Sequence, residues 1–128
     1  MSEHTDRALR DMLLRLSSHG GYLVIGEVEV PYVTTDFELT LHAARALVDA
    51  PGWLENLQDP DLKQRVDRMR AFLRASQPRN DYERALRLEL AALMPDLVPD
   101  EERRAAVAML WSKQLPDGGW STRRMSAR

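Results

Sequence analysis

The sequence predicts an all-α fold of about five helices, paired as antiparallel hairpins, with one small extended segment near residues 22–33. Apolar residues recur three and four positions apart through most of the chain, which is the spacing of one helix face. Capping residues, prolines and glycines interrupt this pattern at short intervals, so short loops join the helices. Short connections favour antiparallel neighbours, as in helical-repeat proteins.

Start and stop residues mark each expected helix. The helices are expected over residues 5–17, 36–50, 60–77, 81–94 and 101–114. The expected caps are Thr5 or Ser2, Thr35, Asp59 and Asn80, and Pro99 precedes the last helix. The helix over 36–50 is apolar on a broad face, so we expect it to be buried on more than one side. Trp53, Leu54 and Leu57, in the loop that follows it, are expected to cover the core.

Residues 22–33 break the helical pattern. Val24, Val28 and Val30 are β-branched, and few helix formers separate them. The segment is predicted to be extended, with a small hairpin around Gly26. Because two strands alone are only marginally stable, they would have to pack on the helices.

The composition limits the classes of function that the chain supports. It has 128 residues, a net charge of -2 and no cysteine, which fits one domain over 1–128 with a flexible tail at about 121–128. Without cysteine, a disulfide scaffold, a thiolate metal site and a cysteine nucleophile are excluded. The charge balance gives no basic face for nucleic acid, and no apolar run reaches the roughly 20 residues of a membrane span. A cytoplasmic protein is expected, because the first residues lack an apolar signal core.

Several helix ends repeat along the chain. Gln77 and Gln114, which are 37 residues apart, each follow an apolar helix end and precede a proline-bearing turn and an aromatic residue. A further match aligns Gly20-Gly21-Tyr22 with Gly118-Gly119-Trp120, although Leu16 stands where the glutamine would be. Helices often end in such residues, so coincidence is the alternative explanation.

The stretch from Lys113 to Trp120 closely resembles the Gln-to-Trp turn of the squalene and oxidosqualene cyclases, which protein prenyltransferase β subunits share in looser form. The resemblance is strong over 108–121 and moderate over 62–121. It implies an α/α toroid repeat in which the glutamine ties the turn to the next repeat, the aromatic ring stacks near it and the glycines make the turn. The structural-turn residues that it implies are Gln77, Gln114, Asp117, Gly118, Gly119 and Trp120.

The resemblance also implies chemistries that can be tested against the residues present. Its zinc-dependent and thioester members need cysteine, which this chain lacks. Class II terpene cyclases use an Asp-x-Asp-Asp-Thr motif, and residues 36–40 (Asp-Phe-Glu-Leu-Thr) are similar to it. The resemblance then implies Glu38 as general acid, Asp36 as its partner and His42 as a proton or orientation partner. The alternative is structural: Thr35 and Glu38 cap the helix, and Asp36 complements its dipole.

No cofactor or metal is expected. The histidines are scattered at His4, His19 and His42, and neither a phosphate-binding glycine loop nor a nucleophile elbow is present. Because the family binds isoprenoids in aromatic-lined hollows, the resemblance implies a hollow for an isoprenoid or another apolar ligand. Its expected lining is Phe37, Trp53, Phe72 and Trp111.

Length argues against a complete toroid. A closed toroid needs at least about 250 residues at helix-pair repeats near 40. The chain is therefore expected to be a fragment, a half-barrel that dimerises or an open repeat domain. We expect a non-catalytic helical-repeat module that binds a protein partner or forms a homo-oligomer through an apolar flank. The alternative is a fragment or subunit of a terpene-cyclase-like enzyme that acts on an isoprenoid substrate with Glu38 as general acid.

Overall fold

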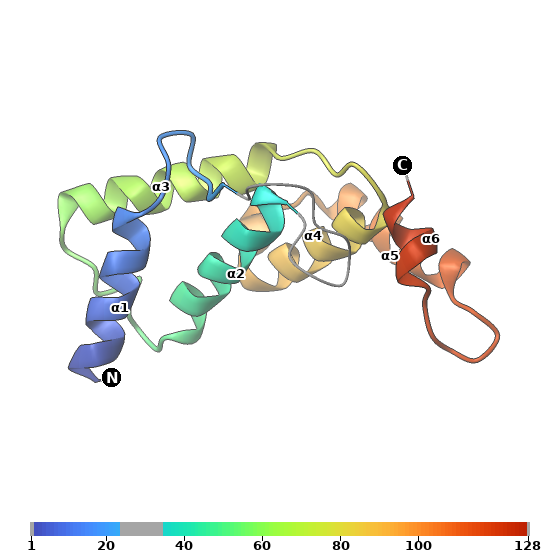
Figure 1. Ribbon diagram of the computed structural model, residues 1–128, viewed down its shortest axis with the longest axis horizontal. Coiled ribbons are helices and arrows are strands. Elements are labelled where there is room, and N and C mark those ends of the chain that lie inside the picture. The colour runs from blue at the N-terminus through green and yellow to red at the C-terminus, as the bar shows by residue number, and fades with distance from the viewer. Residues whose placement is uncertain (1, 24–34, 128) are drawn as a thin grey trace. The chain divides into compact units, whose positions relative to one another are not determined.

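The computed structural model describes residues 2–23 and 35–127, and this part of the protein is helical (Figure 1). The helices are α1 (Glu3–Leu14), α2 (Asp36–Asp49), α3 (Pro60–Ala75), α4 (Asp81–Leu93), the 3₁₀ helix η1 (Pro95–Leu97), α5 (Asp100–Lys113) and α6 (Thr122–Ser126). The all-α prediction is confirmed, and no strand occurs in the described ranges. Most of the predicted extended segment, residues 24–33, lies outside them.

The described residues form two compact units. The N-terminal unit contains residues 2–23 and 35–76, with α1, α2 and α3. The C-terminal unit contains residues 77–127, with α4, η1, α5 and α6. Each unit has its own buried apolar residues and is treated separately below.

Side-chain caps fix the helix starts as the sequence indicates. Ser2, rather than Thr5, caps α1 by accepting a hydrogen bond from the Thr5 amide at 3.1 Å. Thr35 caps α2, and Asp59 caps α3 ahead of a proline in its first turn. Asn80 caps α4. Each cap satisfies a backbone N–H group that has no partner inside its helix, so local sequence is enough to place these starts.

The core of the N-terminal unit lies where α1, α2 and α3 meet. Its fully buried side chains come from all three helices. The largest apolar side chains among them are Leu13, Leu41, Leu47, Met69 and Leu73. Trp53 and Leu57 are each 5% exposed and cover this core, as predicted. The Trp53 indole nitrogen donates to Asp6 Oδ1 at 2.9 Å, so the covering loop is also tied to α1.

In the C-terminal unit, α4 contacts α5, α6 and η1. Leu90 on α4 and Leu97 on η1 are fully buried. The segment expected to be a tail includes α6, which Ser121 caps and which buries Met125. This short helix has one capping residue and one buried apolar side chain. A single apolar residue sets no helical spacing, so the sequence pattern does not predict the helix.

A part-buried ion pair joins α4 to α5. Arg87 is only 4% exposed, and its Nε donates to Glu102 Oε1 while its Nη2 donates to Glu102 Oε2 at 3.3 Å. A guanidinium buried to this extent is tolerated because a carboxylate accepts from it with both oxygens. The pair therefore fixes how α5 is rotated against α4.

Met69 provides a test of the N-terminal core. Met69→Ala should lower the free energy of unfolding by about 2–5 kcal/mol, because truncation leaves a cavity among packed side chains. Urea unfolding followed by circular dichroism measures the loss. Lys63→Ala, on the exposed side of the same helix, is the matched control and should change the stability by no more than about 0.5 kcal/mol. Equal losses for the two variants would contradict the assignment of Met69 to the core.

Candidate functional site

The C-terminal turn, residues 114–120, begins at Gln114, the C-cap residue of α5. Gly118 has φ of 90°, a left-handed conformation that glycine adopts without a steric penalty. The Leu115 amide donates to Gly119 O at 2.8 Å, and the Gly118 amide donates to Leu115 O at 2.9 Å. Gln114 Nε2 donates to Gly118 O at 2.8 Å, and Asp117 Oδ1 accepts from the Gly119 amide at 2.9 Å. The polar side chains of the turn thus stabilise the turn itself.

Trp120 closes this turn against the helix that precedes it. Its indole nitrogen donates to the Leu110 carbonyl, ten residues earlier, at 2.8 Å. The acceptor belongs to the last turn of α5, where backbone carbonyls have no partner inside the helix. The ring remains 43% exposed, so Trp120 serves the turn by its hydrogen bond more than by burial.

The N-terminal turn, residues 16–22, has the same hydrogen-bond pattern. Ser17 N donates to Gly21 O at 3.1 Å, and Gly20 N donates to Ser17 O at 3.0 Å. Gly20 is left-handed, with φ of 96°. The Tyr22 hydroxyl donates to the Met12 carbonyl, again ten residues earlier and in α1. The phenol of tyrosine and the indole of tryptophan each carry a hydrogen-bond donor on an aromatic ring, so either side chain can make this hydrogen bond.

The two turns are therefore equivalent in geometry as well as in sequence. Gly20 corresponds to Gly118 and Tyr22 to Trp120, and the preceding helices α1 and α5 align by the same shift. The match through Gln77 is less exact. Ser76 is the C-cap of α3 and Gln77 follows it, whereas Gln114 is itself a C-cap.

The surroundings of the two turns differ. A Cβ atom added to Gly20 would overlap the Arg68 carbonyl of α3, and one added to Gly21 would lie 2.7 Å from Phe72 Cζ. The N-terminal turn is therefore docked closely on α3. At Gly118, the nearest described atom would be Gln114 Nε2 at 3.9 Å, which belongs to the same turn. Among the described residues, no second helix covers the glycines of the C-terminal turn.

The helix faces before the turns differ in the same way. Leu9 and Leu13 on α1 are 7% and 0% exposed, whereas the aligned Val107 and Trp111 on α5 are 42% and 67% exposed. With Arg104 and Ala108, which are also exposed, these two residues form the α5 stripe. Its members lie three, four and seven positions apart and so share one helix face. A face that α1 buries is open on α5.

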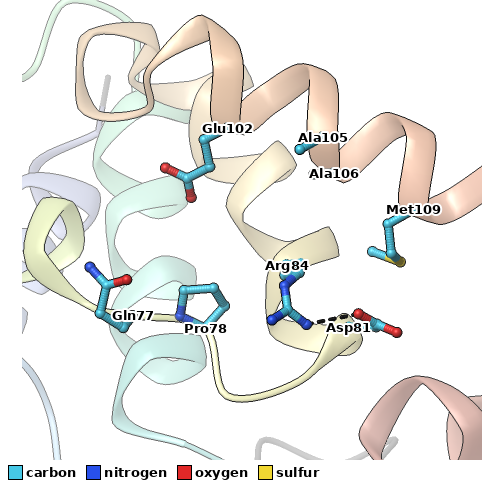
Figure 2. Close-up of a pocket in the computed structure, with 8 residues that line it drawn as sticks. All are labelled: Gln77, Pro78, Asp81, Arg84, Glu102, Ala105, Ala106 and Met109. Atoms are coloured by element: carbon cyan, nitrogen blue, oxygen red, sulfur yellow. Dashed lines mark hydrogen bonds and ion pairs between the residues drawn. The ribbon is translucent and has the colours of Figure 1, made fainter.

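A cavity of about 450 Å³ lies between the start of α4 and the other side of α5 (Figure 2). It is lined by Gln77, Pro78, Asp81, Arg84, Glu102, Ala105, Ala106 and Met109. Figure 2 shows Arg84 turned toward Asp81, to whose Oδ1 its Nη1 donates at 2.8 Å. Lys113 Nζ lies 3.2 Å from the other oxygen of Asp81. Because these charges pair with one another and the α5 wall offers alanine and methionine, the cavity suits a small apolar group better than an ion.

A smaller cavity, of about 270 Å³, lies between α1 and the loop after α2. Asp6 stands at its edge and accepts from the Trp53 indole and from Arg10 Nε, at 3.0 Å for the closer oxygen. These hydrogen bonds, first that of Trp53 and then that of Arg10, hold the pKa of Asp6 below its ordinary value. Because both carboxylate oxygens of Asp6 accept hydrogen bonds from Trp53 and Arg10, we interpret Asp6 as a structural residue that ties the loop after α2 to α1.

The residues resembling the terpene-cyclase acid motif lie on α2, but they differ in exposure. Glu38 is 3% exposed, whereas His42, one turn later, is exposed. Asp36 Oδ2 lies 3.9 Å from His19 Nε2 of the N-terminal turn. The Glu38 amide donates to Thr35 Oγ1 at 3.1 Å, which is the geometry that the structural alternative predicts.

The aromatic residues expected to line an apolar hollow divide between the two units. Phe37 and Trp53 are buried in the N-terminal unit, where the Phe72 ring also meets the His19 ring edge-on at 5.2 Å. Trp111 belongs to the C-terminal unit and, at 67%, is the most exposed large apolar side chain among the described residues. Trp111 is therefore a surface residue.

The described residues offer neither a metal-ligand cluster nor a membrane-spanning helix. In residues 2–23 and 35–127, no three His, Asp or Glu side chains gather closely enough to hold a metal ion. None of the helices in these ranges combines the length and the apolar character that a membrane crossing requires.

No family model matches the chain, and neither a curated protein nor a solved structure matches it. The two equivalent turns and the different cover of the helices before them are the features of the described residues that bear most directly on function.

The glycines of the two turns give a matched pair of substitutions. Gly118→Ala should cost about 1 kcal/mol of stability, because alanine is strained at positive φ. Gly20→Ala should cost about 1–3 kcal/mol more, because its methyl group also meets the α3 backbone. Urea unfolding of both variants measures the difference. Equal losses would show that close docking on α3 does not distinguish the N-terminal turn.

Proposed function

We propose that this chain is a non-catalytic helical-repeat module that binds protein through the α5 stripe. The observation that carries the proposal is the exposure of Val107 and Trp111, at 42% and 67%, where their counterparts on α1 are buried. Fold kinship with the squalene-cyclase type of α/α repeat belongs to the same proposal. It is supported by the glycine turn and its closing aromatic residue.

Exposed tryptophan is a specific indicator of a binding surface. Tryptophan is enriched among the residues that carry most of the energy of protein interfaces, because burying its large ring removes much apolar surface from water. Trp111 lies beside two further apolar residues of the stripe, Val107 and Ala108. A contiguous apolar face of this kind is typical of a contact site, whereas isolated exposed apolar residues are ordinary.

The repeat supplies the physical reason why a helix would cover this face. In helical-repeat proteins each unit buries one face against its neighbour. On α1 the corresponding face is covered by α2 and α3 within the chain. The α5 stripe repeats that face without a described covering helix, so we infer that the partner provides one.

A second candidate function keeps Glu38 as the general acid of a terpene-cyclase-like enzyme acting on an isoprenoid. One observation favours it: the Glu38 carboxyl is 3% exposed, and a general acid must be sheltered from water. The exposed His42 and the capping role of Thr35 favour the structural alternative. Turnover of a prenyl substrate by the chain, lost in Glu38→Gln, would support the enzyme. Equal turnover by the two would exclude Glu38 as the acid.

Photo-crosslinking tests the binding function. A photoreactive amino acid at Ala108, in the centre of the stripe, should give covalent adducts with protein in cells that produce the chain, because the partner lies against this face. The same group at Lys63, exposed on α3, is the control and should give few adducts. Trp111→Ala in the Ala108-labelled chain should reduce the adduct yield by roughly tenfold or more, because an interface tryptophan is truncated. Adducts from neither position, or equally from both, would contradict the proposed function.

A further inference from the structure

We propose that the partner of the α5 stripe is a second copy of this chain, with the two α5 helices packed antiparallel about a two-fold axis. This inference rests on the proposed function and specifies its occupant. It follows from the order of residues within the stripe, from the acidic residues in the first turn of α5 and from the cover that α1 receives.

The stripe is self-complementary in an antiparallel register. About a two-fold axis, residues equally distant from the centre of the contact meet. With the centre between Val107 and Ala108, Val107 lies against the partner's Ala108 and Arg104 lies against the partner's Trp111. Each contact then occurs twice, so a single stripe supplies both halves of the interface.

The paired residues match in chemistry as well as in position. A guanidinium group stacks favourably on the face of an indole ring, and Arg104 and Trp111 are both exposed for such contact. The small side chain of Ala108 lets the two helix axes approach, and Val107 fills the space beside it. A partner without a cation opposite Trp111 would leave this arrangement incomplete.

Charge along α5 favours the antiparallel direction. Asp100 and Glu101, in the first turn, lie four and three positions before Arg104 and so flank the stripe. Parallel packing would bring these acidic residues of the two chains together, whereas antiparallel packing keeps them apart. The helix dipoles have the same preference, since opposite partial charges then lie side by side.

The size of the contact predicts a reversible dimer. One helix face on each chain makes an interface smaller than the roughly 1,600 Å² of a standard stable complex. A small interface with tryptophan at each end can still be specific, because a few side chains supply most of the affinity. Association should therefore depend on concentration within the range accessible to sedimentation equilibrium.

Sedimentation equilibrium of the full chain tests the inference first. The chain should convert from monomer to dimer as its concentration rises, and Trp111→Ala should weaken the dimer by more than roughly tenfold. Arg104→Glu should also weaken it, and Arg104→Glu combined with Trp111→Arg should restore association by placing opposite charges across the interface. Circular dichroism verifies that each variant folds. A monomer at every concentration, or a dimer that Trp111→Ala leaves unchanged, would overturn the inference.

Disulfide trapping tests independently whether the stripe is the interface. Because the chain has no cysteine, a single introduced thiol reports on one position. Ala108→Cys should form a disulfide-linked dimer much faster than Ala92→Cys, the same substitution at an exposed site on α4. Equal rates would overturn the pairing of two chains through the stripe. If the crosslinker at Ala108 captures only a different protein, the homodimer is wrong and the binding function stands; if it captures no protein, both fail.

Discussion

Each unit of the protein reverses its chain after a helix through a left-handed glycine followed by an aromatic hydrogen-bond donor. The glycine reverses the chain after the helix, and the aromatic side chain reaches the carbonyl ten residues earlier. Each turn thus supplies a side-chain donor to a backbone carbonyl in the last turn of the helix, although the Met12 carbonyl also accepts from the Arg15 amide at 3.2 Å. The hydrogen bond also sets where the chain leaves the turn, because the ring and the glycine are fixed relative to the same helix.

The same turn has different consequences in the two units because its neighbours differ. At Gly20 the absence of a side chain lets α3 approach the backbone of the turn, and Phe72 packs beside Gly21 and against His19. The turn therefore acts there as a docking surface as well as a chain reversal. At Gly118 the conformation is preserved without a described helix on the glycine face. The geometry of the turn is accordingly local, and its cover is a separate property.

Local features could be predicted from the sequence because they depend on neighbouring residues. The side-chain oxygens of Thr35, Asp59 and Asn80 cap their helices by accepting from backbone amides two or three positions later. Each of these caps is predictable from the residue and its place in the sequence. The cover of the core by Trp53 could be predicted from its apolar ring, although its hydrogen bond to Asp6 could not, since Asp6 is 47 residues away.

Features that depend on packing could not be predicted in this way. Leu13 and Trp111 occupy aligned positions, but Leu13 is fully buried and Trp111 is 67% exposed. Apolar residues gather on one face of α1 and are spread around α5, so the local pattern distinguishes the two helices, but it does not show whether another helix covers either face. The sequence does not predict α6 for the same reason. Its one buried side chain, Met125, is buried only because the helix contacts α4. Spacing within residues 36–42 suggests Glu38, Asp36 and His42 as candidate catalytic residues. It does not show that Glu38 is buried whereas His42 is exposed.

The exposure of the α5 stripe does not follow from a loosely held helix. On its other side α5 buries Ala106, and the paired Arg87 and Glu102 fix its rotation against α4. Ala106 faces α4, and Trp111 lies five positions later on the same helix. Because residues five positions apart lie on roughly opposite sides of a helix, Trp111 points away from α4. A covering helix would therefore meet a face that is already formed, and its binding energy would not be spent on ordering α5. This preorganisation supports the proposed contact, because a small interface loses less binding energy when its face is already ordered.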